Sequence, residues 1–162
     1  MLAAASALAP QATTAAPTAS SIQVAARLPT FLTPAPAAPI QAVILFRPGD
    51  PASVAEAALI ERTLAQTPSI RIRRVPVDAA AGLTGTRVAF VTNGLSGNYP
   101  AIEKLTRAGV LTIGSERGCA AAAKCVASVV SGSRVEIFIS RAARQASGLK
   151  FKSTFLMLVK EL

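Results

Sequence analysis

Two cysteines, Cys119 and Cys125, stand in the segment GCAAAAKCVASVVSG and are the residues of this chain best suited to chemistry. Their spacing matches neither the Cys-x-x-Cys motif of redox centres nor a zinc knuckle, and a chain without histidine offers only carboxylates to complete a metal site. A nucleophilic thiol would lack its usual histidine base, and Lys124 is only a single neighbouring charge. We therefore expect no metal centre and no catalytic thiol.

Other catalytic groupings are also missing from the sequence. The eight carboxylates are scattered singly, so no acid–base pair emerges, and there is no Gly-x-Ser-x-Gly nucleophile elbow. The segment NGLSGNY lacks both the Gly-x-Gly-x-x-Gly spacing and the Walker pattern of phosphate loops, and we interpret it as a turn. The sequence therefore predicts a protein that is not an enzyme and needs no cofactor.

The ends of two expected strands are candidate contacts for a ligand or partner, because ligands of open parallel sheets gather at the carboxyl ends of strands. The candidate residues are Gly94, Ser96, Gly97, Asn98, Ser115 and Arg117. An anionic metabolite would suit Arg117 and a nearby helix start. A solute-binding module for a small anionic ligand is accordingly one hypothesis.

The formal net charge is +9, from 17 basic and 8 acidic residues. The basic residues are spread along the chain, with RIRR and LKFKS as the clearest clusters. Because no helix-turn-helix, zinc finger or RNP-like aromatic pattern accompanies them, we expect no nucleic-acid binding, whereas attraction to acidic partners or an anionic membrane surface stays open. No apolar stretch is long enough for a membrane span.

Residues 1–38 are predicted to be a disordered tether, since Ala, Pro, Thr and Ser provide too little apolar bulk to order the chain. Ala-x-Ala arrangements within MLAAASALAPQA resemble the end of a secretory signal peptide whose basic and apolar regions are missing. We expect an exported protein with a truncated signal peptide, with a low-complexity cytosolic tail as the alternative. In an exported domain, two cysteines favour a disulfide, and two free buried thiols are the alternative.

Residues 39–162 are predicted to form one α/β domain. The apolar runs AVILF, RVAFV and VLTIG are typical of buried parallel strands, and SIRIRRVPV predicts an edge strand because Pro76 cannot donate to a central ladder. A helix should begin after Asp50 as N-cap, with Ser53 and Glu56 as a second capping box, and NYPAIEKLTRAG predicts another. This alternation indicates a mainly parallel sheet flanked by helices.

The remainder, from CVASVV onward, predicts a C-terminal β-hairpin around Gly132 and then a short helix ending at Gly148. The last segment, KSTFLMLVKEL, is read as a terminal helix with Phe155, Leu158 and Val159 on one face. A strand is the competing interpretation of this segment.

The C-terminal half of the chain carries a recognisable series of short motifs. They are Leu111-Thr112-Ile113-Gly114, Gly118, Gly132 with Arg134-Val135, Ala142-Ala143-Arg144, Gly148-Leu149, and Ser153 with Phe155-Leu156 and Leu158. Through these positions the chain resembles, over residues 40–160, the YfiR-like family of periplasmic proteins. The chain departs from the family pattern at Ser140, where an asparagine is usual, and at Phe138, where the family has an acidic residue. These departures leave the fold in place and put an identical partner in doubt.

The resemblance implies a non-enzymatic regulator in a cyclic-di-GMP pathway. Such a protein would bind the periplasmic sensor part of an inner-membrane signalling protein of the diguanylate cyclase type and restrain it. A homodimer stays open. Disulfides occur in the family, including a close cysteine pair in a comparable loop, so a redox response of Cys119 and Cys125 follows by analogy.

Overall fold

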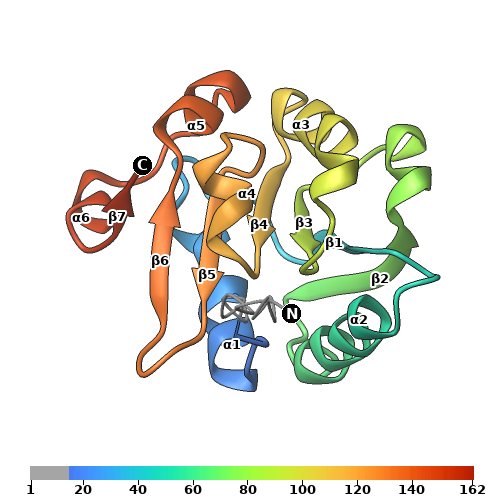
Figure 1. Cartoon of the computed structure of the whole chain (residues 1–162). Helices are drawn as coiled ribbons and strands as arrows, with labels where there is room; N and C mark the ends of the chain where they lie inside the picture. Colours follow the sequence, from blue (N-terminus) through green and yellow to red (C-terminus); the bar gives the residue numbers. More distant parts are fainter. Residues whose placement is uncertain (1–14) are drawn as a thin grey trace, which may run out of the picture.

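The computed structural model describes residues 15–162, which form a seven-stranded sheet flanked by helices (Figure 1). The strand order is β2-β1-β3-β4-β5-β6-β7. Neighbours from β2 to β5 pair in parallel, β6 is antiparallel to β5, and β7 is parallel to β6. The predicted α/β class with a mainly parallel sheet is confirmed. The strands are β1 (Ile40–Phe46), β2 (Ile70–Pro76), β3 (Val88–Val91), β4 (Leu111–Gly114), β5 (Ala127–Val130), β6 (Glu136–Ile139) and β7 (Lys160–Glu161).

Two apolar layers pack against the sheet. One contains buried side chains of the helices α1 (Ala19–Arg27) and α2 (Pro51–Leu64) with Phe151 and Phe155. The other contains those of the 3-10 helix η2 (Val77–Gly82), α3 (Tyr99–Arg107) and both cysteines. The remaining helices are η1 (Leu28–Phe31), η3 (Ser96–Asn98), α4 (Arg117–Ala121), α5 (Arg141–Ser147) and α6 (Ser153–Leu156). No described helix has the length and apolar character needed to cross a bilayer.

The start of α2 follows the expected N-cap but not the second capping box. Asp50 Oδ1 accepts from the backbone N–H groups of Ala52 at 3.0 Å and Ser53 at 3.4 Å, so Asp50 is the cap. The predicted capping box of Ser53 and Glu56 is wrong. Both side chains are buried and turn inward, where Ser53 Oγ lies 2.7 Å from Thr92 Oγ1 at the end of β3.

The edge position of β2 is confirmed, since β2 pairs only with β1 within the described residues. Ile70 and Val75 are buried, whereas Arg71, Arg73 and Arg74 are exposed. Exposed arginines on an edge strand discourage pairing with another chain.

The predicted boundary of the tether at residue 38 needs correction. Thr18 caps α1 in a capping box with Ser21, and the side chains of Ile22 and Leu28 are buried in the core. Few apolar residues suffice here because Ile22, Ala25 and Leu28 are buried in the core, while Val24 and Ala26 pack partly against it. Residues 1–14, with the predicted signal-peptide end, lie outside the described residues.

The C-terminal hairpin and terminal helix are present, but the helix is short. It ends at Leu156, and residues 160–161 then add β7 to the sheet. The expected apolar face is wrong for Leu158, because Phe155 is buried whereas Leu158 is 85% exposed. The helix interpretation therefore holds for residues 153–156, and the strand interpretation holds for residues 160–161.

Candidate functional site

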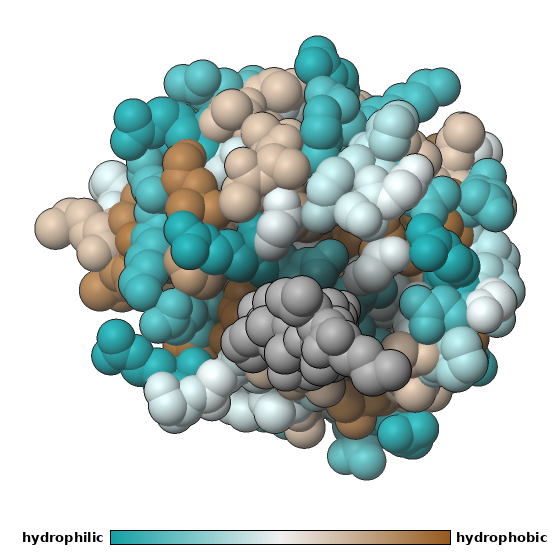
Figure 2. Space-filling model, in the orientation of Figure 1, coloured by the Kyte–Doolittle hydropathy of each residue, from teal (hydrophilic) through white to brown (hydrophobic). Residues whose placement is uncertain are grey.

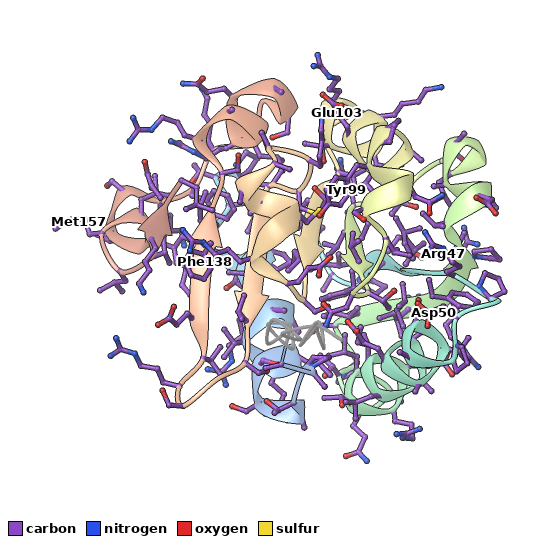
Figure 3. All side chains as sticks on the ribbon, in the orientation of Figure 1. Arg47, Asp50, Tyr99, Glu103, Phe138 and Met157 are labelled. Atoms are coloured by element: carbon purple, nitrogen blue, oxygen red, sulfur yellow. A yellow bond between two sulfur atoms is a disulfide. The ribbon has the colours of Figure 1, made fainter. Side chains whose placement is uncertain are left out.

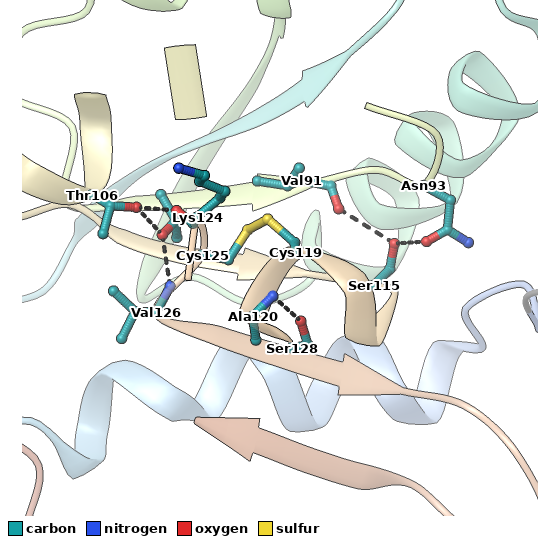
Figure 4. The surroundings of a disulfide bond; sticks show 11 residues. Val91, Asn93, Thr106, Ser115, Cys119, Ala120, Lys124, Cys125, Val126 and Ser128 are labelled. Carbon is teal, nitrogen blue, oxygen red and sulfur yellow. Dashed lines mark hydrogen bonds between the residues drawn. A yellow bond between two sulfur atoms is a disulfide. The ribbon is translucent and has the colours of Figure 1, made fainter. Parts of the chain in front are cut away.

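A disulfide joins Cys119, in α4, to Cys125, just before β5, with a Cα–Cα distance of 5.2 Å (Figure 4). Both cysteines are buried in the apolar layer between the sheet and α3. The bridge therefore closes a short loop whose second end leads directly into the β5–β6 hairpin. Within residues 15–162, no group of three or more His, Cys, Asp or Glu side chains is placed to hold a metal ion.

The disulfide loop is also held by hydrogen bonds. The backbone N–H groups of Lys124 and Cys125 donate to Cys119 O at 3.0 and 3.1 Å. Thr106 Oγ1 donates to Lys124 O at 2.6 Å (Figure 4). Lys124 Nζ lies 2.6 Å from Glu103 Oε2, and hydrogen bonds from Lys124 and then Arg107 hold the pKa of Glu103 below its ordinary value. The turn thus has native contacts that do not depend on the sulfur–sulfur bond.

Buried polar contacts fasten this loop to the sheet. Thr106 Oγ1 lies 2.6 Å from Thr112 Oγ1 of β4, and Thr112 Oγ1 accepts from the N–H of Val126 at 3.0 Å. Gly114, at the end of β4, is closely surrounded, so that a side chain there would require its neighbours to shift. A Cβ there would lie 3.1 Å from Cys119 Cβ. The sequence pattern gives the identity of these residues but not this close approach.

A second cluster lies at the carboxyl ends of β3 and β4, around the buried carboxyl group of Glu56. The N–H of Asn93 donates to Glu56 Oε2 at 3.1 Å, and Ser115 Oγ donates to Glu56 Oε1. Ser115 Oγ also lies 2.7 Å from Asn93 Oδ1 (Figure 4). Burial raises the pKa of Glu56, Ser115 and Asn93 oppose that rise, and the charges of Glu116 and Asp50 add to it. Glu56 therefore joins α2 to two strand-end loops.

The predicted loop residues Gly94, Gly97 and Asn98 approach the segment that follows β1. Arg47 Nη2 donates to Asn98 Oδ1 at 2.8 Å, and Asn98 Nδ2 donates to Asp78 Oδ1 at 3.3 Å. A Cβ on Gly97 would lie 3.6 Å from Arg47 Nη2. Gly94 needs its glycine because its φ is +81° and a Cβ would lie 3.4 Å from an oxygen of Asp50.

The other predicted contacts separate from this group. Ser96 is exposed on η3, and Ser115 is engaged with Glu56. Arg117 turns away toward β6, where its guanidinium carbon lies 5.0 Å from the ring centroid of Phe138. The hydrogen bonds described for the side chains at the strand ends thus join them to other residues of the protein. A role of these residues in ligand or partner binding stays a prediction.

An exposed apolar turn between α6 and β7 was missed by sequence reasoning. Met157 is 84% and Leu158 85% exposed, and Met157 points away from the body of the protein (Figure 3). Hydrophobic atoms gather at this edge of the molecule (Figure 2). Leu158 also borders a hollow of about 310 Å³, whose lining includes Val135 just before β6, Ile137 of β6 and Lys160. The only sign of this exposed turn in the sequence is that two apolar residues, Met157 and Leu158, stand next to each other.

The chain is similar to a known family in sequence and to solved proteins in structure. A family model described as YfiR/HmsC-like matches residues 26–160. No curated protein matches the chain. A conserved domain protein from Vibrio cholerae is similar in structure, with a TM-score of 0.68, 10% identity, and coverage of 92% of this chain and 61% of that one.

A second similar structure is an ABC domain in complex with L-Trp from Streptococcus pneumonia. It has a TM-score of 0.64 and 10% identity, with coverage of 88% of this chain and 60% of that one. The chain thus spans about three fifths of the length of both structures. At this identity the likeness establishes the α/β fold alone.

Proposed function

The chain belongs to the YfiR/HmsC-like family, and we propose that it binds and restrains the periplasmic sensor part of an inner-membrane signalling protein of the diguanylate cyclase type. Members of this family are periplasmic regulators in cyclic-di-GMP signalling rather than enzymes. The partner and the manner of restraint are the parts that we propose for this chain.

The exposed pair Met157 and Leu158 is the observation that carries the proposal. Large apolar side chains exposed next to each other mark surfaces that another molecule covers. Beside them, Val135 and Ile137 are the apolar part of the lining of the hollow, whose other lining residues besides Leu158 are the charged Arg134, Glu136 and Lys160. We propose that an apolar side chain of the partner enters this hollow and packs on Leu158.

Charge supports an acidic partner surface around this apolar centre. Lys152 is exposed beside the turn, and the chain carries a formal net charge of +9, whereas the exposed Lys160 is paired with Glu136. A charge of one sign speeds the encounter with a partner of the opposite sign and makes it sensitive to salt. We expect the on-rate to fall as ionic strength rises.

Capture from solubilised inner membranes tests the proposal. Wild-type protein should retain a diguanylate cyclase type protein that mass spectrometry identifies. The double variant Met157→Ser/Leu158→Ser should lose it, because both changes remove apolar contact without touching the core. The matched control is Ala79→Ser/Ala81→Ser, two exposed positions on η2. Equal capture by both variants, or recovery of no signalling protein, would count against the proposal.

A redox response is the finer part of the proposal. The loop closed by Cys119 and Cys125 continues into β5, which pairs with β6. The start of β6, at residues 136–137, borders the hollow beside Leu158. We propose that reduction loosens the hairpin and weakens partner binding. The same capture with reduced protein tests this, and unchanged affinity after complete reduction would contradict it.

A homodimer is a separate prediction, which light scattering of the purified chain checks.

A further inference from the structure

A hollow of about 310 Å³ lies at the amino-terminal end of the sheet. Its lining includes the segment at residues 32–37 and the segment at residues 148–150 after α5, which are neighbours joined by a β-bridge between Leu32 and Phe151. Arg87, which precedes β3, and Gly109, which precedes β4, complete the lining. The hollow is therefore at the end of the sheet opposite to Gly94, Asn98 and the other strand-end loops.

Two cations border this hollow, and no carboxylate lines it. Arg87 and Lys150 are exposed, and neither side chain forms an ion pair or a hydrogen bond within residues 15–162. By contrast, Lys124, Arg141 and Lys160 are each paired with a glutamate. The lining of the hollow thus carries two uncompensated positive charges.

The segment next to Lys150 is apolar and has little side-chain freedom. It consists of Pro34, Ala35, Pro36 and Ala37 in sequence, of which Pro36 is half-buried and the others are exposed. The N–H of the preceding Thr33 donates to the backbone O of Lys150 at 2.8 Å and holds the two segments together. A ligand would therefore meet a surface whose shape exists beforehand, which lowers the entropy cost of binding.

We propose that this hollow binds a small organic anion that carries a doubly charged oxyanion on a compact apolar body. The oxyanion lies between the side chains of Arg87 and Lys150, where charge-assisted hydrogen bonds are strong. The apolar body packs on Pro34 and Pro36. A volume of about 310 Å³ is at the small end of ligand pockets, which restricts the body to about one ring. The site is independent of the partner surface at Met157 and Leu158.

Titration of the isotope-labelled full chain, followed by NMR, tests the proposal with three probes. Phenyl phosphate presents both the charge and the ring, inorganic phosphate presents the charge alone, and benzyl alcohol presents the ring alone. We expect saturable shifts with phenyl phosphate at the amides of Ala35, Ala37, Gly109 and Leu149. Its affinity should exceed that of either other probe at least tenfold.

The variants Arg87→Gln/Lys150→Gln and Arg27→Gln/Arg62→Gln separate a built site from general attraction, since each loses two charges. Arg27 and Arg62 are exposed cations that do not line this hollow. The first variant should bind phenyl phosphate at least tenfold more weakly, and the second should bind as the wild type does. Equal weakening in both variants, shifts spread over the whole surface, or the same affinity for inorganic phosphate would overturn the proposal.

Discussion

Reduction of the bridge between Cys119 and Cys125 should lower the free energy of unfolding by about 2 kcal/mol. The two cysteines are 6 positions apart, and the loop-closure relation gives about 2 kcal/mol for a loop of this size. Stability is lost because the unfolded chain gains conformational entropy when the bridge is broken. In the folded state, Lys124 keeps its backbone bond to Cys119 O at 3.0 Å and its contact with Glu103 at 2.6 Å. We therefore expect the reduced protein to stay folded.

Urea unfolding followed by far-UV circular dichroism measures this difference, because the chain lacks tryptophan and has one tyrosine. At an m-value of about 2 kcal/mol/M, the midpoint should fall by about 1 M urea on reduction. The variant Cys119→Ala/Cys125→Ala is the control, and reductant should leave its midpoint unchanged. A wild-type change below about 0.5 kcal/mol would refute the loop-closure argument, which predicts about 2 kcal/mol. So would an equal change in the variant.

Three further changes test other contacts of the candidate site. Burial raises the folded pKa of Glu56 above its ordinary value of 4.5, so its stabilising contribution is full below pH 4.5 and is lost as pH rises through the folded pKa. Glu56→Gln should flatten this fall in urea midpoints, and an unchanged profile would contradict it. Gly114→Ala should destabilise by about 1–3 kcal/mol because the new Cβ crowds Cys119, whereas Gly82→Ala, with nothing within 4 Å, should not. Thr112→Val should cost about 1–3 kcal/mol, since it leaves a buried N–H without its acceptor, and thermal unfolding checks both substitutions.

The sheet could be predicted from the sequence because its strands carry local signals. The run from Ala42 to Phe46 is continuous and apolar, as expected for a strand covered on both faces, and β1 lies between β2 and β3. The alternation of Ile70, Arg71 and Ile72 instead indicates one wet face, and β2 is at the edge. Such patterns reflect which side chains of one strand are buried, so they can be recognised in the sequence of that strand alone.

Contacts between distant elements could not be predicted in this way. Glu56 has the sequence spacing of a capping box with Ser53, yet its carboxyl group meets Asn93 and Ser115, which belong to loops 37 and 59 positions away. The N-terminal helix was missed for a related reason. The helix has few apolar residues. They are enough to hold it on the protein because residues such as Ile22 are buried in the core with side chains of α2 and the sheet, which the local sequence does not reveal.

The exposed turn at Met157 and Leu158 results from competition between two ways of using the C-terminal segment. A longer α6 would have continued the i, i+3, i+4 pattern from Phe155, but the backbone leaves the helix so that β7 can pair with β6. This pairing gains hydrogen bonds such as Leu162 N to Ile139 O at 2.8 Å, and an ion pair of Lys160 with β6.

The same pairing leaves two large apolar side chains in water. Burying a side chain of this size contributes roughly 1.5–3 kcal/mol, and neither Met157 nor Leu158 obtains that contribution within residues 15–162. A partner that covers both would supply it on binding. The Met157→Ser/Leu158→Ser variant should therefore lose partner capture while keeping the urea midpoint of the wild type. A large loss of stability would instead assign these side chains to the fold.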